Sequence, residues 1–372
     1  MTFISFVWLF LFGIRESLVV FSAKTTLLTA AITGLQLLNL FLLLQKNKWK
    51  FTGFHLLLPI FIILVPYNTG ALVMVNITLS IILLKDIPFQ KVAFIACISM
   101  ILGLFIYLSG FSMGFAKDVV EISHKGGYSH TLGFKNPNTP GLAFMRVALI
   151  CSTFLLYNLK LKFPVYLFFI PAYYVYLLTK SRTSFLALCI YFVLLFYFSF
   201  KRKYWLERKI VIIVPFLLYS ATFLLCAFST LFPILDIFFS RRFSINNVTL
   251  GNLSYIQYMF GSRIPADSPL DSAYIVQMFN GGIFAVWIFL YCCARGIYNM
   301  PLKQAKVFLP YILCLLISGF AEDTFSMSYV SVILFYKMLV DQFSLSNIRS
   351  RYIFVLKKSS QLEHKELKEV LE

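Results

Sequence analysis

The number of apolar segments is the feature that most constrains the fold of this chain. Hydrophobic residues make up 60% of its 372 residues and charged residues only 13%, whereas a soluble domain has about 45–50% apolar and about 25% charged residues. The excess is divided among many stretches, each near the length that crosses a hydrocarbon core about 30 Å thick. The sequence therefore predicts a membrane protein without a separate soluble domain.

Helices fit these segments better than strands do. Only α-helices and closed barrels satisfy every backbone polar group inside lipid, and barrel strands alternate apolar and polar residues, which residues 211–225 do not. We therefore expect an all-α polytopic protein with about 10–12 transmembrane helices, in which the shorter pairs could be re-entrant or tilted. The predicted segments are 1–14, 25–44, 52–66, 70–84, 90–110, 139–157, 163–178, 183–200, 210–232, 271–293, 305–321 and 325–341.

The distribution of basic residues predicts the orientation. The formal net charge is +18, and because Lys and Arg mark the cytoplasmic loops of membrane proteins, a nucleic-acid partner is not needed to explain it. Basic loops follow every second predicted helix, which places both termini in the cytoplasm. We expect one transmembrane domain over residues 1–343 and a cytoplasmic C-terminal tail over residues 344–372.

Two long loops are predicted on the opposite face, at about 112–138 and 232–270. Loops of this length in a compact protein usually carry function or are disordered. The second loop contains many aromatic residues, which argues against disorder. We expect it to fold back onto the membrane surface as a cap.

The outer face carries more basic residues than the positive-inside rule predicts. An anionic ligand would explain them, because the planar arginine side chain binds two phosphate oxygens at once, although exterior loops can also tolerate scattered lysines. Arg182 lies in a short turn before a helix N-terminus, which is itself a favourable place for an anion. The residues concerned are Lys117, Lys125, Lys135, Lys180, Arg182, Arg241, Arg242 and Arg263, together with Arg146 about two turns inside a helix.

Three acidic residues on this face are candidates for chemistry. Asp271 begins a predicted helix and is either its N-cap or a general base. Glu322 and Asp323 lie between two closely spaced helices and could orient an arginine, pair with Arg146 or act as a general base. Arg146 is thus open to two interpretations, a structural ion pair or a substrate contact. The seven cysteines and four histidines have no metal-binding spacing, so no metal site is expected.

Three motifs on the same face resemble a known family when they are taken in order. Gly-Phe-Lys-Asn-Pro-Asn at 133–138 leads into a helix, and Leu-Thr-Lys-Ser-Arg-Thr-Ser at 178–184 separates two helices. The large loop ends in Leu-Asp-Ser-Ala-Tyr at 270–274, and Gly281-Gly282 follows in the next helix. This order, over essentially the whole chain, resembles the Wzy-type polysaccharide polymerases of the O-antigen polymerase and ligase superfamily.

The resemblance implies a GT-C-like fold with a large extracytoplasmic loop and a membrane-embedded glycosyltransferase activity. Such enzymes polymerise undecaprenyl-pyrophosphate-linked oligosaccharide repeat units into O-antigen, capsule or exopolysaccharide on the outer face of the bacterial cytoplasmic membrane. The implied mechanism uses a lipid-pyrophosphate donor and no cofactor. The implied partners are these lipid-linked oligosaccharides, membrane lipid, and a chain-length regulator and flippase of the same pathway. The ligase branch often has a His-Asn pair where this chain has Asp271-Ser272, which favours polymerase over ligase.

Roles for individual residues follow from the resemblance and from the chemistry of a pyrophosphate leaving group. Arginines would neutralise the developing negative charge, and a carboxylate would activate the acceptor hydroxyl. The expected catalytic residues are Arg182, Asp271 and Glu322. The expected substrate-binding residues are Arg146, Arg241, Arg242, Arg263, Lys135, Asn136, Asn138 and Tyr274.

A transporter is the main competing interpretation, either a lipid-linked oligosaccharide flippase or a solute carrier. Twelve helices fit it equally well, but transporters commonly contain internal repeats, and the two halves of this chain show none. The polar residues also gather at one face instead of the middle of the bilayer. A structural or signalling membrane protein is a third possibility, which the short tail supports little.

Overall fold

A computed structural model of the chain describes residues 3–18, 26–45, 53–66, 68, 70–122, 128–134, 136–200, 205–238, 241–262, 271–324 and 329–343. The tail at 344–372, and with it the predicted cytoplasmic position of the C-terminus, lies outside the described residues.

The described residues are mainly α-helical, and each of the twelve predicted apolar segments contains a helix. The helices are α1 (Phe3–Leu18), α2 (Thr26–Gln45), α3 (Gly53–Leu64), α4 (Ala71–Leu84), α5 (Phe89–Ser112), α6 (Asn138–Tyr157), α7 (Phe163–Tyr166), α8 (Phe169–Thr179), α9 (Arg182–Phe200), α10 (Trp205–Ala227), α11 (Pro233–Phe238), α12 (Arg242–Gly251), α13 (Tyr255–Phe260), α14 (Ala273–Asn299) and α15 (Leu302–Ser318). A further helix, which we call the last helix, covers 330–343. The predicted segment 163–178 is divided between α7 and α8.

Five described helices are long and apolar enough to cross a membrane. They are α5, α6, α9, α14 and the part of α10 from Arg208 to Ala227. Shorter apolar helices occur at Ala31–Gln45, Ala71–Leu84 and Phe163–Thr179. The prediction of an all-α protein with membrane-type helices is therefore confirmed at this level.

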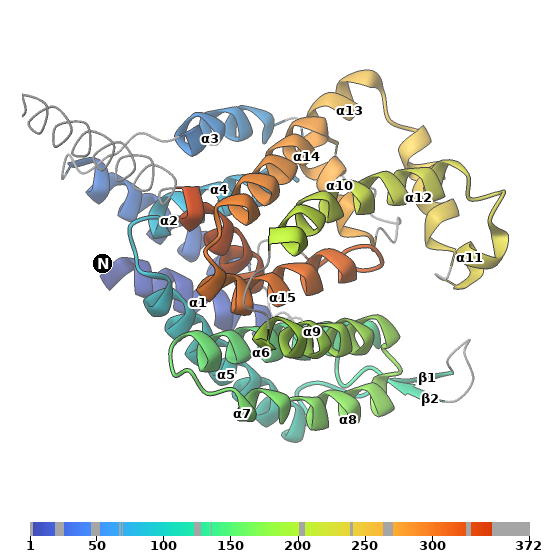
Figure 1. Cartoon of the computed structure of the whole chain (residues 1–372), viewed down its shortest axis with the longest axis horizontal. Coiled ribbons are helices and arrows are strands. Elements are labelled where there is room, and N and C mark those ends of the chain that lie inside the picture. Colours follow the sequence, from blue (N-terminus) through green and yellow to red (C-terminus); the bar gives the residue numbers. More distant parts are fainter. Residues whose placement is uncertain are drawn as a thin grey trace, which may run out of the picture.

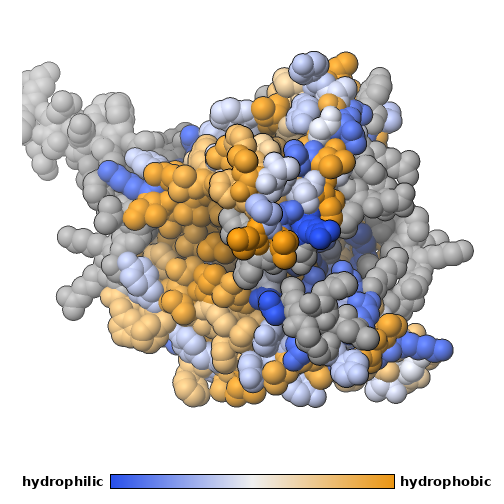
Figure 2. Space-filling view, turned by 90° about the vertical axis from the view of Figure 1, so that its right-hand side faces the viewer, coloured by the Kyte–Doolittle hydropathy of each residue, from blue (hydrophilic) through white to orange (hydrophobic). Residues whose placement is uncertain are grey.

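The helices form a bundle with two distinct ends (Figure 1). We call the end at which α5, α8, α10 and α15 finish the loop end. It lies on the right in Figure 1, where β1 (Val120–Ile122), β2 (Tyr128–His130), α11 and α12 project beyond the bundle. Figure 2 looks onto this end and shows hydrophilic residues among hydrophobic ones, with a broad hydrophobic area along the left of the view. The loop end is therefore the place to look for polar chemistry.

At the opposite end, basic side chains bind backbone carbonyls of neighbouring helices. An Nη atom of Arg208 donates to the Tyr298 carbonyl at 2.7 Å, and Lys306 Nζ lies 3.3 Å from the Ser199 carbonyl. Cations suit such positions because the last carbonyls of a helix lack partners within it. These contacts join α10 to α14 and α15 to α9.

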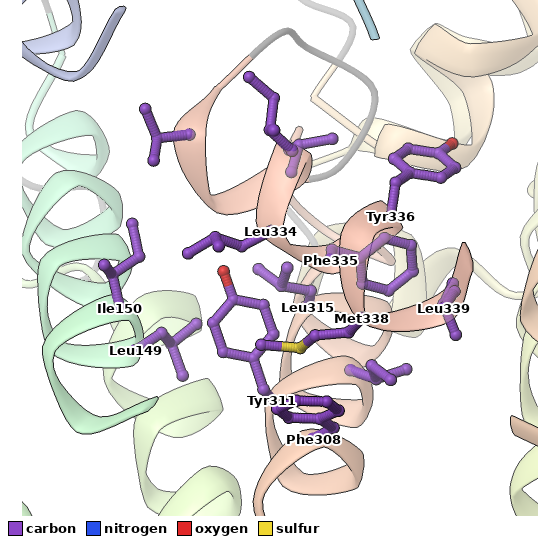
Figure 3. Close-up of a cluster of buried hydrophobic side chains, with 14 of the residues drawn as sticks. Leu149, Ile150, Phe308, Tyr311, Leu315, Leu334, Phe335, Tyr336, Met338 and Leu339 are labelled. Atoms are coloured by element: carbon purple, nitrogen blue, oxygen red, sulfur yellow. The ribbon is translucent and has the colours of Figure 1, made fainter. Parts of the chain in front are cut away.

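The core is apolar and is centred on α15 and the last helix. Tyr311 of α15 is fully buried, and Figure 3 shows it between Leu149 and Ile150 of α6 and Leu334 of the last helix. Its hydroxyl donates to the Ser331 carbonyl at 2.8 Å, so its buried polar atom is satisfied. This packing holds α6, α15 and the last helix together below the loop end.

Helix α14 is broken near its middle. Gly281 and Gly282 have non-helical backbone angles, and Gly282 adopts φ 62° and ψ −161°, a region that is essentially restricted to glycine. Just before the break, the Phe279 carbonyl accepts hydrogen bonds from the Asn68 side chain at 2.7 Å and from the Ser262 backbone N–H at 2.8 Å. The turn that contains Asn68 and the residue that follows α13 and Gly261 therefore meet at the break.

Substitution of Gly282 by alanine is expected to destabilise the protein. A Cβ atom at this position would lie 2.2 Å from the Met259 carbonyl oxygen, and the backbone strain alone costs about 1–3 kcal/mol. We expect a lower thermal unfolding temperature for the detergent-solubilised variant. Gly34→Ala is the matched control, because its Cβ would meet nothing within 4 Å. Equal unfolding temperatures for the two variants would contradict this account of the break.

The two predicted long loops contain secondary structure. The first forms an antiparallel hairpin of β1 and β2, whose base is closed by His130 Nδ1 and Asp118 Oδ2 at 2.5 Å. The second contains α11, α12 and α13, so its aromatic composition corresponds to packed helices. Phe243 and Leu250 of α12, for example, are buried against the first half of α14.

Candidate active site at the loop end

Arg242 is held between two carboxylates at the loop end. Its Nε atom lies 3.1 Å from Asp271 Oδ2, and one Nη atom lies 3.1 Å from Glu322 Oε1. The Glu322 side chain is 5% exposed, that of Arg242 14% and that of Asp271 37%. We call these three residues the loop-end triad. Solvent reaches this triad mainly at Asp271.

The first turn of α12 positions Arg242. Asp236 is buried, and its Oδ1 atom accepts the backbone N–H groups of Phe243 at 2.9 Å and Ser244 at 3.2 Å. A carboxylate at a helix N-terminus satisfies free N–H groups and favours the helix dipole. Phe243 also packs edge-on against Phe320, with ring centroids 5.5 Å apart. These contacts hold the backbone directly after Arg242 in place.

Hydrogen bonds between the end of α15 and the start of α14 position the two carboxylates. The Gly319 carbonyl accepts the Ala273 backbone N–H at 2.9 Å and the Ser272 hydroxyl at 3.3 Å. The Glu322 backbone N–H donates to the Ser318 carbonyl at 3.0 Å. These bonds bring Asp271 and Glu322, about 50 positions apart in the chain, within reach of Arg242.

Burial shifts the pKa of Glu322 toward neutral pH. Burial raises the pKa of Glu322 to about 7, because it penalises the ionised form more than Arg242 stabilises it, and the nearby Asp271 charge raises the pKa further. A hydrogen bond from the Thr183 side chain acts in the opposite direction. Burial also raises the pKa of Asp271, opposed by Arg242. A carboxylate with a pKa near 7 is the kind of group that can act as a general base at neutral pH.

Arg182 is linked to the triad through its neighbour Thr183, whose side chain hydrogen-bonds Glu322. It is the first residue of α9, directly before Thr183, and its side chain is exposed. Within the part of the chain that the structure describes, Arg182 forms no ion pair. The turn before it is tight, because Lys180 adopts a left-handed conformation and the Ser181 N–H bonds the Thr179 hydroxyl oxygen. An exposed guanidinium is therefore held at the loop end by a rigid turn.

The structure does not bring the other predicted residues into the triad. Tyr274 is buried, and its hydroxyl donates to the Leu316 carbonyl at 2.8 Å, so it packs α14 against α15. The Asn136 Oδ1 atom accepts the Asn138 backbone N–H at 2.8 Å, which caps the start of α6. Arg241 is exposed and adopts a left-handed conformation. Lys135 and Arg263 lie outside the described residues.

Arg146 belongs to a separate buried cluster. Its side chain is buried in α6, and its guanidinium carbon lies 3.5 Å from the centroid of the Tyr329 ring. Glu16 of α1 is close enough to attract it electrostatically and accepts the Val330 backbone N–H. Of the two interpretations of Arg146, internal ionic packing fits this arrangement better than a contact with solvent-borne substrate. Of the two carboxylates that the sequence offered as partners for Arg146, Glu322 binds Arg242 instead.

Thr183 and Asp236 were not predicted as site residues. Asp236 lies only seven residues before Phe243 and caps α12 through Phe243 and Ser244, so an acidic residue just before a helix was a local signal for this role. Thr183 contacts Glu322, which is far away in the chain, so nothing local in the sequence marks it as a neighbour of the triad. Among the described residues, no group of three or more His, Cys, Asp or Glu side chains could hold a metal ion.

No protein-family model, curated protein or solved structure matches this chain. Its function must therefore be inferred from the site itself and from the order of its motifs.

Proposed function

We propose that this protein polymerises lipid-pyrophosphate-linked oligosaccharide repeat units at the outer face of the bacterial cytoplasmic membrane. The supporting observation is the loop-end triad, in which an arginine and a carboxylate with a pKa near 7 share one buried site beside membrane-type helices. The motif order in the sequence supports the same class. The proposed orientation places the loop end outside and both termini in the cytoplasm, with about 10–12 membrane crossings.

In the proposed reaction, a hydroxyl of the acceptor sugar attacks the anomeric carbon of the donor. The new glycosidic C–O bond forms while the bond from that carbon to the pyrophosphate oxygen breaks, and the hydroxyl proton moves to Glu322. Lipid pyrophosphate leaves with the electron pair of the broken bond. No external oxidant, reductant or nucleotide is consumed.

Protonation of Glu322 would also change the environment of Arg242. A neutral Glu322 no longer competes with the leaving group for the guanidinium, which becomes available to the pyrophosphate oxygens. Arg182, exposed beside Thr183, would bind the same anion from the neighbouring helix. In this proposal a single proton transfer activates the acceptor and prepares the site for the leaving group.

Replacement of Arg182 by alanine is expected to collapse the high-molecular-weight ladder of surface glycan toward a single repeat unit. Removal of one preorganised donor to a developing negative charge typically costs roughly 10²–10³ in rate. The measurement is gel analysis of glycans extracted from the native host, after confirmation that the variant reaches the membrane. Arg295→Ala is the matched control, because Arg295 is exposed at the opposite end. Long polymer in the Arg182→Ala strain would contradict a catalytic role for Arg182, and long polymer in a full deletion would contradict the polymerase assignment.

A transporter, such as a lipid-linked oligosaccharide flippase, is the second candidate. The break in α14 favours it, because discontinuous membrane helices often mark transport sites near the bilayer midplane. The Phe279 carbonyl beside the break, however, already accepts hydrogen bonds from Asn68 and Ser262, which is consistent with a structural role for the break. A flippase would move lipid-linked units across vesicles without joining them, so product length distinguishes the two functions.

A further inference from the structure

We infer that α13 lies within the hydrocarbon depth of the bilayer and contacts lipid acyl chains, instead of resting on the membrane surface. Together with the α3–α4 pair it forms two re-entrant segments that enter from opposite sides and meet at the break in α14. This inference concerns the insertion of the chain in the membrane and is independent of the proposed reaction. It replaces the surface cap that the sequence predicts for this part of the second loop.

The break in α14 lies inside the hydrocarbon core. Helix α4 has 14 residues, which correspond to about 21 Å at 1.5 Å per residue. Because α4 finishes at the end opposite the loop end, its first residue lies inside a hydrocarbon core about 30 Å thick. Along α14, the eight residue steps from Ala273 to Gly281 correspond to about 12 Å. Both lengths place the break well inside the core and not at its surface.

The α3–α4 pair reaches this level from the end opposite the loop end. The two helices pack together, and both are too short to span a bilayer. The tip between them contains Asn68, whose side-chain amide donates to the Phe279 carbonyl at 2.7 Å and contacts the Asn280 carbonyl at 3.3 Å. The pair therefore turns back where α14 is broken.

Helix α13 reaches the same level from the loop end. The Ser262 N–H binds the Phe279 carbonyl at 2.8 Å, and a Cβ on Gly261 would lie 2.4 Å from that carbonyl oxygen. Phe260 stacks on Phe284 of α14, with centroids 5.5 Å apart. Figure 1 shows α13 alongside α14 and within the length of the bundle, whereas α11 and α12 project beyond it.

The surface of α13 suits hydrocarbon. Tyr255 is 93% exposed and Ile256 73% exposed, and Met259 and Phe260 are also exposed. In water such a patch would be unfavourable, but beside Trp287 of α14, which is exposed as well, it extends the lipid-facing surface. Tyr255 begins the helix nearer the interface, where amphipathic aromatic rings are enriched.

Hydrogen bonds at both ends of α13 reduce the cost of placing this helix in lipid. At the N-terminus, Ser254 and Gln257 form a reciprocal capping box. At the C-terminus, the Gly261 N–H binds the Gln257 carbonyl at 2.8 Å, and the Tyr258 hydroxyl donates to the Leu250 carbonyl at 2.8 Å. A short helix with its ends paired can lie at membrane depth without a large desolvation cost.

Collision accessibility of nitroxide labels in lipid nanodiscs tests this inference. The full-length protein carries Ile256→Cys in a background whose seven native cysteines are replaced by alanine. We expect the label at Ile256 to collide with oxygen several-fold more often than with a water-soluble nickel chelate. Val193→Cys on α9, which is 67% exposed, serves as the hydrocarbon reference, and Glu121→Cys on β1 as the water reference. A value at Ile256 equal to that at Glu121 would overturn the inference.

A second measurement covers the case in which the cysteine-free protein does not fold. A photoreactive benzophenone amino acid replaces Ile256 in the otherwise native chain, and crosslinked peptides are identified by mass spectrometry. Adducts with phospholipid acyl chains, as at Val193, are expected. Adducts absent at Ile256 but present at Val193 would contradict insertion. Neither measurement depends on polysaccharide synthesis, so failure here leaves the proposed function untouched.

Discussion

Replacement of Arg242 by alanine is expected to abolish polymer formation and to lower the thermal unfolding temperature of the protein. The change leaves Glu322 and Asp271 close together without the cation that each contacts at 3.1 Å. Breaking a buried ion pair by removal of one partner typically costs about 3–5 kcal/mol. Here Asp271 is partly exposed, so we expect the lower end of that range. Glycan gels and thermal unfolding in detergent measure the two effects.

The neighbouring Arg241 provides the matched control for Arg242. Its side chain is exposed, and its backbone role at the start of α12 is retained in Arg241→Asn, because asparagine tolerates the left-handed conformation seen there. We expect Arg241→Asn to keep its unfolding temperature and long polymer. If Arg242→Ala behaves like this control, the triad is neither structural nor functional.

Replacement of Glu322 by glutamine is expected to remove activity. It is also expected to make the unfolding temperature less dependent on pH. The glutamine keeps the size of the side chain and an oxygen that can accept a hydrogen bond from Arg242. It cannot, however, take up the proton of the acceptor-sugar hydroxyl. Loss of a positioned general base typically costs about 10²–10⁴ in rate. The assay uses isolated membranes and lipid-linked repeat units extracted from the deletion strain. Glu322→Asp, which keeps the carboxylate, is expected to retain part of the activity.

The sign of the stability effect follows from the direction of the pKa shift. Glu322 has its pKa raised from 4.5 to about 7 in the folded state, so the folded protein holds a proton that the unfolded chain releases. Its contribution to stability is complete below pH 4.5 and is lost as the pH rises through 7, and amounts to about 3 kcal/mol. The wild-type unfolding temperature should therefore fall between pH 5 and about pH 8, more than that of Glu322→Gln. Parallel curves for the two proteins would contradict a proton on Glu322.

Wild-type activity should change with pH in the opposite direction. A general base must be ionised, so polymerisation in isolated membranes should rise as the pH increases through about 7. This measurement needs no variant. Activity that falls over the same interval would exclude Glu322 as the base.

Much of the helical framework could be predicted from the sequence, because apolar length is a local property. Every predicted segment contains a helix, and the turn before Arg182 lies where the sequence places it. The break in α14 was harder to predict. Gly281-Gly282 is visible in the sequence, but the hydrogen bonds at the break come from Ser262 in the preceding loop and from Asn68, which is more than 200 positions away.

The sequence predicted which residues form the candidate site better than it predicted which of them contact one another. We expected all three residues of the loop-end triad at this face. The sequence did not show, however, whether Glu322 would pair with Arg146 or with another arginine. Tertiary contacts decide which arginine pairs with Glu322. Helix α12 brings Arg242 to Glu322 at the end of α15, whereas the Arg146 guanidinium stacks on the Tyr329 ring. Tyr274 shows the converse case, because its position after Asp271 suggested substrate contact, whereas packing buries it completely.

Reconstitution of the purified protein tests the proposed function most directly. The protein is placed in nanodiscs and given only lipid-linked repeat units extracted from the deletion strain, and both polymer length and released lipid pyrophosphate are measured. We predict a ladder of products with one lipid pyrophosphate released for each linkage formed, and neither product with Glu322→Gln. Repeat units that stay single with wild-type protein, while proteoliposomes move them from one leaflet to the other, would contradict the polymerase and identify a flippase.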